Sequence, residues 1–484
     1  MKETSTLTRV EERNLGDGSI PVFNPSTGEQ IAAVAAGGKA EVDAAVSKAR
    51  QAFDSGVWRD LSGGARAKVL NRAADILEER AEQMAVAESR NNGMPIRFTR
   101  AVVQAGVDTL RYYAGWTTKL YGMSYNLVSD SYLGQSRAEF HTYTLKEPYP
   151  VAGLILPWNG PILMACMKLA PALAAGCSVV IKPSEEAPLT TMMLVDILAE
   201  AGMPDCVVNL VTGYGHTAGA ALTEHPNVDK ISFTGSTEVG KAIIHASTVN
   251  IKRLTLELGG KSPVFVFDDA EMEKAIPGAA FGVFVNSGQA CVAGSRIFVH
   301  RKVYDQFVEG FARFADSLKL GDSIDPDTIL GPLISPRQLD RVSAFVKEGK
   351  AAGVEVVAGG SQLDRPGNFF KPTVLTNVRE DMRLFREEIF GPVVSIVPFD
   401  DEEDALRIAN NTSYGLASAI WTQNITRAHR LAKRLEAGTV WVNCQLTMDD
   451  AVPFGGYKES GLGTERALGA IEAFLQQKSV FVRL

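Results

Sequence analysis

Apolar residues follow a helical spacing in the first part of this chain and strand-like patterns after it. Up to about Gly122 they mostly follow helical spacing, for example in residues 41–53 and 65–89. Residues 137–145 (RAEFHTYTL) instead alternate apolar and polar positions, as a half-exposed strand does. We therefore expect mostly helices in the first part, followed by an extended arm or hairpin.

From Val151 onward, short apolar runs alternate with helical stretches. The runs are VAGLIL, SVVIK, VVNLV, KISF and LTLEL, and residues 189–200 and 217–224 between them have helical spacing. Strands that are apolar on both faces and separated by helices are typical of a parallel sheet with crossover helices. The sequence therefore predicts an α/β fold here.

A second α/β segment runs from Pro263 to about Val440. Its predicted strands are PVFVF, RIFVH and VVSIVPF, and its predicted helices span residues 303–318, 338–352 and 402–410. The last residues, SVFVRL, are expected to form a terminal strand. Such a strand could pair with another subunit or simply be the edge of a sheet.

Residues 162–181 form a mostly apolar stretch of a length that could cross a membrane. Lys168, Pro171 and Gly176 interrupt the stretch, and these residues favour a buried helix followed by a strand. The N-terminal residues are polar and do not resemble a signal peptide. We therefore expect no membrane partner.

Charge and cysteine content narrow the classes of function. The chain of 484 residues has a net charge of −7 and no basic run, so nucleic acid is not an expected partner. Five cysteines, an odd number, lack metal-ligand spacing, so neither a disulfide framework nor a metal site is expected. They are Cys166, Cys177, Cys206, Cys291 and Cys444. Sparse thiols fit a reducing, cytoplasmic compartment.

Cys291 is the first candidate for chemistry. It lies in GQACVAGSR, where glycines and small residues let a ligand approach the backbone closely. A nucleophilic thiol needs access and a lowered pKa. From this context alone, an inert, buried core cysteine is the more frequent outcome.

Two further polar residues follow predicted strands. Glu257 lies near the end of LTLEL, which Gly-Gly follows, at the edge where α/β sheets bind ligands, and could act as a general base. Asn159, in PWNGP after VAGLIL, could donate to an oxyanion. Each residue also has a simpler interpretation, a solvated carboxylate at a strand exit and an Asn that satisfies its own turn.

Two segments have features of a nucleotide site. Lys182 and Glu185 of IKPSE could hold ribose hydroxyls, or they could form a surface salt bridge. SFTGSTEVGK joins a strand, a Gly-rich turn and a helix, but its glycine spacing matches no phosphate-binding fingerprint. A helix N-terminus beside Ser236 could still bind a pyrophosphate.

In their order along the chain, these segments closely resemble the aldehyde dehydrogenase superfamily. The matching segments are PWNGP, KPSE, FTGSTEVG, LELGGKSP, GQACVAGSR, EEIFGPV and PFGGYKESG. The resemblance implies an α/β fold with a Rossmann-like cofactor-binding domain in residues 1–125 and 145–258 and a catalytic domain in residues 259–455. It also implies a small β bridging segment, residues 126–144 and 468–484, in a homo-oligomer, a dimer or tetramer.

The resemblance assigns roles to individual residues. Cys291 matches the nucleophile, Glu257 the general base and Asn159 the oxyanion donor. Lys168 and Glu465 match residues that relay protons from the base. The implied cofactor-binding residues are Ile155, Pro157, Trp158, Lys182, Glu185, Gly215, Gly219, Phe233, Gly235, Ser236, Val239, Leu258, Glu388 and Phe390. The implied substrate-pocket residues are Gly160, Met164, Met167, Val285, Ala290, Val292, Met448 and Phe454.

The implied reaction oxidises an aldehyde to a carboxylic acid and needs no metal. The Cys291 thiolate adds to the aldehyde carbon, and Asn159 with the Cys291 backbone N–H holds the oxyanion. Hydride leaves to NAD, and Glu257 activates the water that hydrolyses the remaining thioester. Glu185 favours NAD over NADP, and weaker use of NADP stays open.

The substrate pocket departs from relatives that prefer small aliphatic aldehydes, which have aromatic residues there. Because Gly160, Met167, Val285 and Met448 occupy the matching positions, we expect a wide pocket for a bulky, apolar aldehyde, aromatic or terpenoid. A promiscuous pocket that also takes aliphatic aldehydes is the open alternative. A CoA-acylating dehydrogenase and a catalytically silent protein of this fold are less favoured, since the base, nucleophile and oxyanion donor are all present. Hydrolysis of activated esters by the same Cys and oxyanion hole is expected as a side activity.

Overall fold

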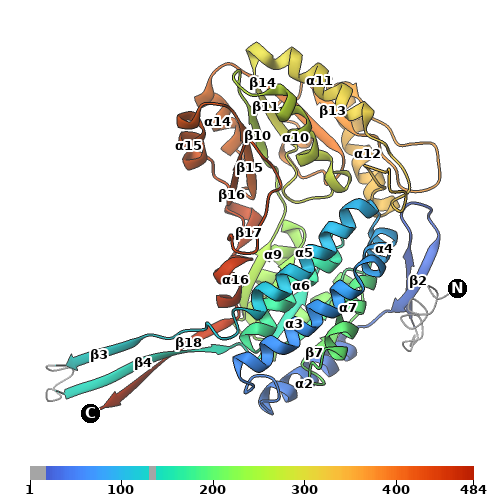
Figure 1. Cartoon of the computed structure of the whole chain (residues 1–484). Coiled ribbons are helices and arrows are strands. Elements are labelled where there is room, and N and C mark those ends of the chain that lie inside the picture. Colours follow the sequence, from blue (N-terminus) through green and yellow to red (C-terminus); the bar gives the residue numbers. More distant parts are fainter. Residues whose placement is uncertain (1–17, 130–137) are drawn as a thin grey trace.

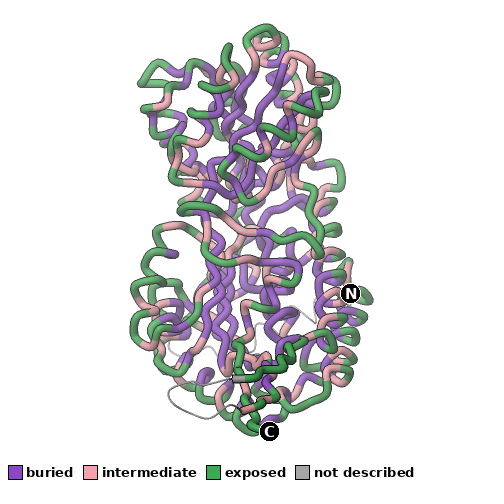
Figure 2. The backbone as a smooth tube through the Cα atoms, turned by 90° about the vertical axis from the view of Figure 1, so that its left-hand side faces the viewer, coloured by how far each residue is buried: buried purple, intermediate pink, exposed green. Residues whose placement is uncertain are grey.

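The structure is a computed structural model that describes residues 18–129 and 138–484. Two α/β bodies lie one above the other in Figure 1, and a long arm of strands projects from the lower body. The lower body contains a six-stranded sheet and the upper body a seven-stranded sheet. Figure 2 shows that the buried backbone lies in the interior of both bodies.

The first part of the chain forms a hairpin and four helices. The hairpin strands are β1 (Ser19–Phe23) and β2 (Gln30–Ala35), and the helices are α2 (Lys39–Asp54), α3 (Gly63–Glu79), α4 (Ala81–Asn92) and α5 (Ile96–Ala114). The expectation of one helix over 65–89 was wrong, because the chain turns at Arg80, with φ −107° and ψ 15°. The Arg80 guanidinium forms an ion pair with Glu200, a contact between residues far apart in sequence that apolar periodicity cannot reveal.

The six-stranded sheet confirms the predicted parallel sheet. Its strands are β5 (Val151–Ile155), β6 (Ser178–Lys182), β7 (Val208–Leu210), β8 (Lys230–Thr234), β9 (Arg253–Glu257) and the short β17 (Gly461–Leu462). The spatial order is β17-β9-β8-β5-β6-β7, and only β17 is antiparallel to its neighbour. Connecting segments are α6 (Pro161–Ala175), α7 (Leu189–Glu200), the π-helical turn η1 (Gly215–Gly219), α8 (Ala220–Glu224), α9 (Thr237–Ala246) and η2 (Ser247–Val249).

The apolar stretch 162–181 is the buried helix α6 followed by the strand β6, as expected. Gly176 ends the helix with φ 105°, a left-handed conformation that favours glycine. Pro171 lies inside the helix without ending it. Among the described residues, no helix combines the length and hydropathy that a membrane span requires.

The seven-stranded sheet confirms the second α/β segment. Its order is β12 (Glu355–Ala358), β13 (Thr373–Thr376), β14 (Val393–Phe399), β11 (Arg296–His300), β10 (Pro263–Val266), β15 (Ala417–Trp421) and β16 (Thr439–Val442). Its helices are α10 (Met272–Phe284), α11 (Tyr304–Ser317), α12 (Pro336–Ala351), α13 (Arg383–Arg386), α14 (Glu402–Asn410) and α15 (Ile425–Arg434), with short turns η3 (Val285–Gly288), η4 (Arg301–Val303) and η5 (Lys458–Ser460). Separate apolar clusters cover its two faces, one with Val264 and Ile297 and the other with Phe265 and Phe298.

The projecting arm is a three-stranded antiparallel sheet. It consists of β3 (Ser124–Ser129), β4 (Ala138–Pro148) and β18 (Leu475–Arg483), and α16 (Ala467–Glu472) precedes its last strand. The strand predicted in 137–145 is therefore confirmed for 138–145, while residue 137 lies outside the described residues. The predicted terminal strand is also confirmed, and it pairs with β4 of its own chain.

Candidate active site

The carboxyl ends of four parallel strands lie along one edge of the six-stranded sheet. The register places Ile155 beside Lys182 and Phe233, and Thr234 beside Glu257. The chain builds β6 and β7 on one side of β5 and later β8 and β9 on the other, which opens a crevice at this edge. The segments that leave these strands carry most of the candidate residues.

The Gly-Gly pair after Glu257 lets two distant segments meet at this edge. A Cβ atom at Gly259 would lie 2.5 Å from a carboxylate oxygen of Glu388, and one at Gly260 would lie 2.2 Å from the carbonyl oxygen of Cys291. Neither position could therefore carry a side chain without displacing its neighbour. The Gly260 N–H also donates to Glu388 Oε1 at 3.0 Å.

Cys291 lies in a loop just before β11 and is half-buried. Burial raises the pKa of its thiol to about 12, and the nearby negative charges of Glu388 and Glu257 add to this effect. The thiol therefore rests protonated at neutral pH. Its ionisation requires a base or a compensating positive charge.

Asn159 joins the turn after β5 to the Cys291 loop. Its Nδ2 donates to the carbonyl oxygen of Gln289 at 2.9 Å, and Asn286 Nδ2 donates to the Asn159 carbonyl oxygen at 3.1 Å. Asn286 and Ser287 have φ values of 49° and 54°, so this loop makes a sharp turn. An amide nitrogen carries two hydrogens, which leaves one for an oxyanion next to Cys291.

Glu257 is almost fully buried, with 3% of its surface exposed. Neither carboxylate oxygen has a hydrogen-bond partner among the described residues. Burial raises its pKa well above the usual value, the negative charge of Glu465 raises it further, and Lys168 opposes the shift. A carboxylate with both oxygens free and a raised pKa is suited to accept a proton from water.

Behind Glu257 lies a buried ion pair between Lys168 and Glu465. Lys168 Nζ donates to Glu465 Oε1 and, at 3.0 Å, to Ser232 Oγ on β8. Ser232 Oγ in turn lies 3.4 Å from Glu465 Oε1 and can donate to it. The sequence-predicted pair is thus brought together, and Ser232 is a partner that the sequence analysis missed.

The turns after β5 and β6 are held from behind by α4. Glu88, fully buried on this helix, accepts from Thr190 Oγ1 and from the Ile162 N–H at 3.3 Å. Asn91 accepts from the Leu189 N–H at 3.1 Å. Burial raises the pKa of Glu88 to about 7. Because α6 follows Asn159 and α7 follows Glu185, α4 fixes both site segments.

A cavity of about 430 Å³ opens at the crevice between β5, β6 and β8. Its walls are largely apolar and come from the strand ends, from α8 and from α9. At its polar side, Lys182 Nζ lies 3.4 Å from Glu185 Oε2, and the Gly215 N–H donates to Glu185 Oε1 at 3.4 Å. A cavity of this size, with a cation and a carboxylate at one side, can hold a ribose and its base.

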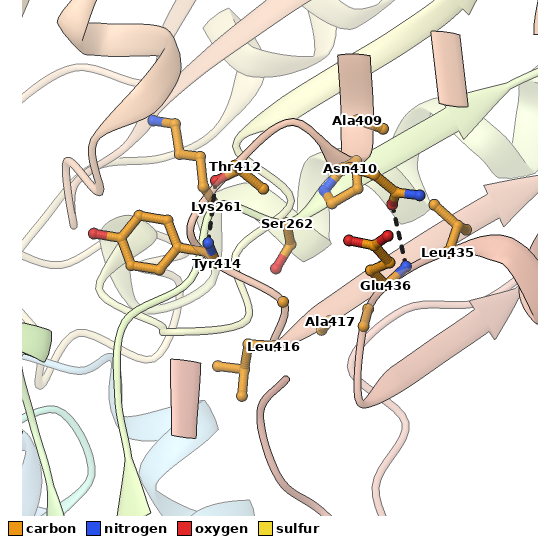
Figure 3. A pocket seen from close by; sticks show the side chains of 13 residues that line it. Lys261, Ser262, Ala409, Asn410, Thr412, Tyr414, Leu416, Ala417, Leu435 and Glu436 are labelled. Carbon is orange, nitrogen blue, oxygen red and sulfur yellow. Dashed lines mark hydrogen bonds between the residues drawn. The ribbon is translucent and has the colours of Figure 1, made fainter. Parts of the chain in front are cut away.

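A smaller cavity lies on the other side of the Gly-Gly pair, between β10, β15 and the segment after α14 (Figure 3). It measures about 10 Å³, which is room for about one water molecule. The buried Lys261 lies on the same side as Tyr414, and burial lowers the pKa of Lys261 to about 7. A space of this size admits solvent and neither an aldehyde nor a nucleotide.

Comparison with known proteins identifies the family. Residues 12–480 match the sequence model of the aldehyde dehydrogenase family. The chain belongs to this family. Among its relatives, aldehyde dehydrogenase 1 of Tanacetum cinerariifolium is 44% identical over 96% of this chain and 92% of the relative. Human retinal dehydrogenase 2 is 42% identical over 100% of this chain and 92% of the relative.

Solved structures of aldehyde dehydrogenases have the same fold. The NAD⁺ complex of aldehyde dehydrogenase from Bacillus cereus superposes with a TM-score of 0.93 at 44% identity, covering 96% of this chain and 94% of that chain. PnpE in complex with nicotinamide adenine dinucleotide gives a TM-score of 0.91 at 44% identity, covering 96% and 94%. The α/β fold expected from the resemblance is thereby confirmed.

In this aldehyde dehydrogenase, most predicted cofactor positions surround the 430 Å³ cavity. Those that line it are Ile155, Pro157, Trp158, Lys182, Glu185, Gly215, Gly219, Phe233, Gly235 and Val239. Ser236 lies at its margin and caps α9, accepting from the Val239 N–H at 3.3 Å. Leu258 is buried against Gly240. The rings of Phe390 and Trp158 pack edge to face with their centroids 5.2 Å apart, which places Phe390 beside a residue that lines the cavity.

Further residues line this cavity that no sequence motif indicated, many of them on α8 and α9. The additional lining residues are Leu156, Ser184, His216, Ala220, Thr223, Glu224, Thr234, Ala242, Ile243 and Ala246. Several are alanines or other common helix residues with no distinguishing motif. For the residues on α8 and α9, only the position of these helices after β7 and β8 could have indicated that they line the cavity.

The predicted substrate positions of this dehydrogenase lie in different surroundings. Gly160 begins α6, and the space where its Cβ would stand is open to at least 4 Å. Met167 is buried, and its sulfur accepts from Arg466 Nη2 at 3.6 Å. Val285 lines a separate apolar pocket of about 90 Å³, and Met448 is 41% exposed.

The other four substrate positions flank Cys291 or lie in apolar cores. Ala290 is half-buried beside Cys291, and Met164 is half-buried on α6. Val292 and Phe454 are buried in the cluster that covers one face of the seven-stranded sheet. Whether these residues line one substrate pocket therefore stays a prediction.

Proposed function

We propose that this enzyme oxidises an aldehyde to its carboxylic acid with NAD, using Cys291 as the nucleophile. The supporting observation is the meeting of three segments far apart in sequence, which place Cys291, Asn159 and Glu257 at one strand edge. When bound, NAD supplies the acceptor for the hydride. All other steps are assigned to side chains and backbone groups of the chain.

The cavity at the strand edge fits the adenosine part of NAD. The Glu185 carboxylate can accept from both ribose hydroxyls, while Lys182 beside it can donate. The apolar walls from α8 and α9 suit a flat base. A 2′-phosphate would face the Glu185 charge, so NADP is the weaker cofactor. Ser236 at the start of α9 and Glu388 beside Gly260 are proposed to hold the pyrophosphate and the second ribose.

The chain supplies the covalent chemistry. The Cys291 thiol first loses its proton to solvent water, and the thiolate sulfur then adds to the aldehyde carbon. The free Asn159 N–H with the Cys291 backbone N–H stabilises the oxyanion of the thiohemiacetal. Loss of hydride leaves a thioester on Cys291. Glu257 takes a proton from water, and the resulting hydroxide attacks the thioester carbon and releases the acid.

The proposed substrate is a bulky, apolar aldehyde, aromatic or terpenoid. The open space at Gly160 at the start of α6 and the flexible Met164 and Met167 on the same helix support it. The name of one relative, human retinal dehydrogenase 2, refers to retinal, an aldehyde of this type. A broad specificity that includes aliphatic aldehydes is the alternative.

We also propose a homo-oligomer, a dimer or tetramer, that assembles through the arm. Phe481 and Val482 on β18 are 64% and 43% exposed, and Leu127 on β3 is 43% exposed. Exposed apolar side chains on a projecting arm favour a contact that covers them in solution. The five free cysteines fit a reducing, cytoplasmic location. The boundaries of the cofactor-binding and catalytic domains stay as predicted from the resemblance.

The experiment is NADH formation across a panel of aldehydes, repeated with NADP and without CoA. We expect turnover without CoA, a higher kcat/KM for aromatic or terpenoid aldehydes than for acetaldehyde, and loss of activity in Cys291→Ala. A requirement for CoA would instead indicate an acylating dehydrogenase. Equal kcat/KM for acetaldehyde and a terpenoid aldehyde would reject the bulky-substrate proposal alone.

A further inference from the structure

The polar groups behind Glu257 continue along one face of β8 and β9. In this parallel pair, Ser232 stands beside Thr255 and Thr234 beside Glu257. Paired residues of neighbouring strands point to the same face, and residues two apart along a strand do so as well. Lys230, Ser232, Thr255 and Glu257 therefore share one face, all with at most 3% of their surface exposed.

Ser232 connects the known ion pair to this face. Its hydroxyl accepts from Lys168 Nζ at 3.0 Å and lies 3.4 Å from Glu465 Oε1, to which it can donate. A hydroxyl that accepts from one group and donates to another can pass a proton between them. The ion pair alone, without Ser232, would have no contact with β8 among the described hydrogen bonds.

Lys230 stands at the far end of the same face. Its Nζ donates to Thr255 Oγ1 at 2.5 Å and lies over the Phe474 ring, 5.6 Å from the centroid. The charged or titratable groups around it are Lys168 from α6, Glu465, Cys177 just before β6 and Arg253 on β9. No carboxylate among the described residues forms a hydrogen bond with Lys230.

We propose that Ser232, Thr255 and Lys230, the β8–β9 column, carry away the proton that Glu257 takes from water during hydrolysis of the thioester. This inference rests on the proposed function. Water loses a proton to Glu257 as its oxygen bonds to the thioester carbon, and the C–S bond then breaks to release the acid and the Cys291 thiolate. The proton then moves through Glu465 and Lys168 to Ser232, from Ser232 to its strand neighbour Thr255, and from the Thr255 hydroxyl to the Lys230 amine. Each transfer breaks one O–H or N–H bond and forms another, so no electrons are exchanged.

The state of Lys230 is consistent with an acceptor at the end of the column. Burial and the positive charge of Lys168 lower its pKa to about 7, although Glu465 opposes this. At neutral pH both the amine and the ammonium are therefore populated. Ser232 and Thr255 act through other groups and are positioning residues for this transfer.

The test compares Ser232→Ala, Thr255→Val and Lys230→Met with the wild-type enzyme. A burst of NADH in the first turnover reports hydride loss, and rapid quenching of acid formation reports hydrolysis of the thioester. Both rates are measured from acid to alkaline pH and in heavy water. Ser418→Ala is the matched control, since it removes a buried hydroxyl from β15 in the other body.

We expect an unchanged burst and acid formation slower by about tenfold in Ser232→Ala, Thr255→Val and Lys230→Met, with a larger solvent isotope effect. Ser232→Thr, which keeps the hydroxyl, should recover at least half of the rate, and Ser418→Ala should match the wild type. A purely structural role would slow the burst and acid formation together and would leave the isotope effect unchanged.

The proposal would be overturned if all three variants kept the rates, pH profiles and isotope effects of the wild type while Glu465→Gln formed acid slowly. That result would end the proton path at Glu465. If Lys230→Met does not fold, Ser232→Ala and Thr255→Val decide the question. Absence of an NADH burst in the wild-type enzyme would reject the proposed function, a separate outcome from failure of the column.

Discussion

At the scale of single residues, burial controls the ionisation of the two reacting groups. The pKa of the Cys291 thiol is raised to about 12 and that of Glu257 is raised well above its usual value. A negative charge on Glu257 raises the pKa of Cys291, so the site disfavours a negative charge on both groups at once. Nucleophile and base are therefore expected to ionise at different steps.

Replacing Glu388 with Gln should make Cys291 more acidic. The Glu388 charge is the largest contribution after burial to the raised pKa of Cys291, so removing it favours the thiolate. We expect alkylation of Cys291 by iodoacetamide to become faster at fixed pH, with its pH midpoint moved to lower pH. Glu387→Gln is the control, because that neighbouring side chain is paired with Arg383. An unmoved midpoint in Glu388→Gln would contradict this electrostatic account.

Glu257→Gln should separate the two halves of the reaction. Gln cannot take a proton from water, so we expect a normal NADH burst followed by acid release slowed by about 10²–10⁴. In the wild type, acid release should decline as pH falls through the raised pKa of Glu257, above the usual value of 4.5. Loss of the burst together with acid release would show that Glu257 is needed before the thioester forms.

Glu185→Ser should increase the use of NADP. The substitution removes a negative charge from the polar side of the cavity, where a 2′-phosphate would lie. We expect the ratio of kcat/KM for NADP over NAD to rise by about tenfold or more. Glu186→Ser is the matched control, since the Glu186 side chain is paired with Arg337. Equal ratios in the two variants would remove Glu185 from the proposed ribose site.

At the scale of elements, α4 supports the site by fixing the starts of α6 and α7. Its buried Glu88 stays protonated up to a pKa of about 7, whereas an unfolded Glu ionises near 4.5. Between pH 4.5 and pH 7, Glu88 therefore keeps its proton in the folded protein but has lost it in the unfolded chain. The contribution of Glu88 to stability is full below pH 4.5 and falls as pH rises toward 7.

Glu88→Gln should weaken this pH dependence of stability. Gln keeps the shape and cannot ionise, so the variant should gain up to about 3 kcal/mol relative to the wild type above pH 7, and nothing at pH 4.5. The measurement is Tm from pH 4.5 to 8.5. Glu82→Gln, at an exposed position on the same helix, should not show this gain. A constant difference between Glu88→Gln and wild type at every pH would contradict the assigned pKa.

The same scale shows what the sequence could and could not predict. Helices such as 189–200 and 402–410 were predicted to the residue, because apolar periodicity is a local property. Helical spacing of apolar residues continues past the break at Arg80, and the π-helical turn at Gly215–Gly219 has no local signal. Lys168 and Glu465, which the resemblance implies as proton-relay residues, form an ion pair, but their shared partner Ser232 was visible only in three dimensions.

At the scale of the whole molecule, the arm extends well beyond the two bodies (Figure 1). Several of its apolar residues are exposed in a single chain, and the proposed oligomer would bury them against another copy. Phe481→Asp should place a charge in that contact, and we expect a smaller mass in size-exclusion chromatography with light scattering. Lys478→Asp on the same strand, already paired with Glu147, is the comparison. An unchanged mass in Phe481→Asp would locate the contact elsewhere.

The central claim is that oxidation proceeds through a thioester on Cys291. The most direct measurement is mass spectrometry of Glu257→Gln after incubation with an aldehyde and NAD. We predict that the peptide containing Cys291 gains the mass of the acyl group, and that Cys444→Ala does not change this result. An acyl group on another cysteine, or turnover in Cys291→Ala, would contradict the account.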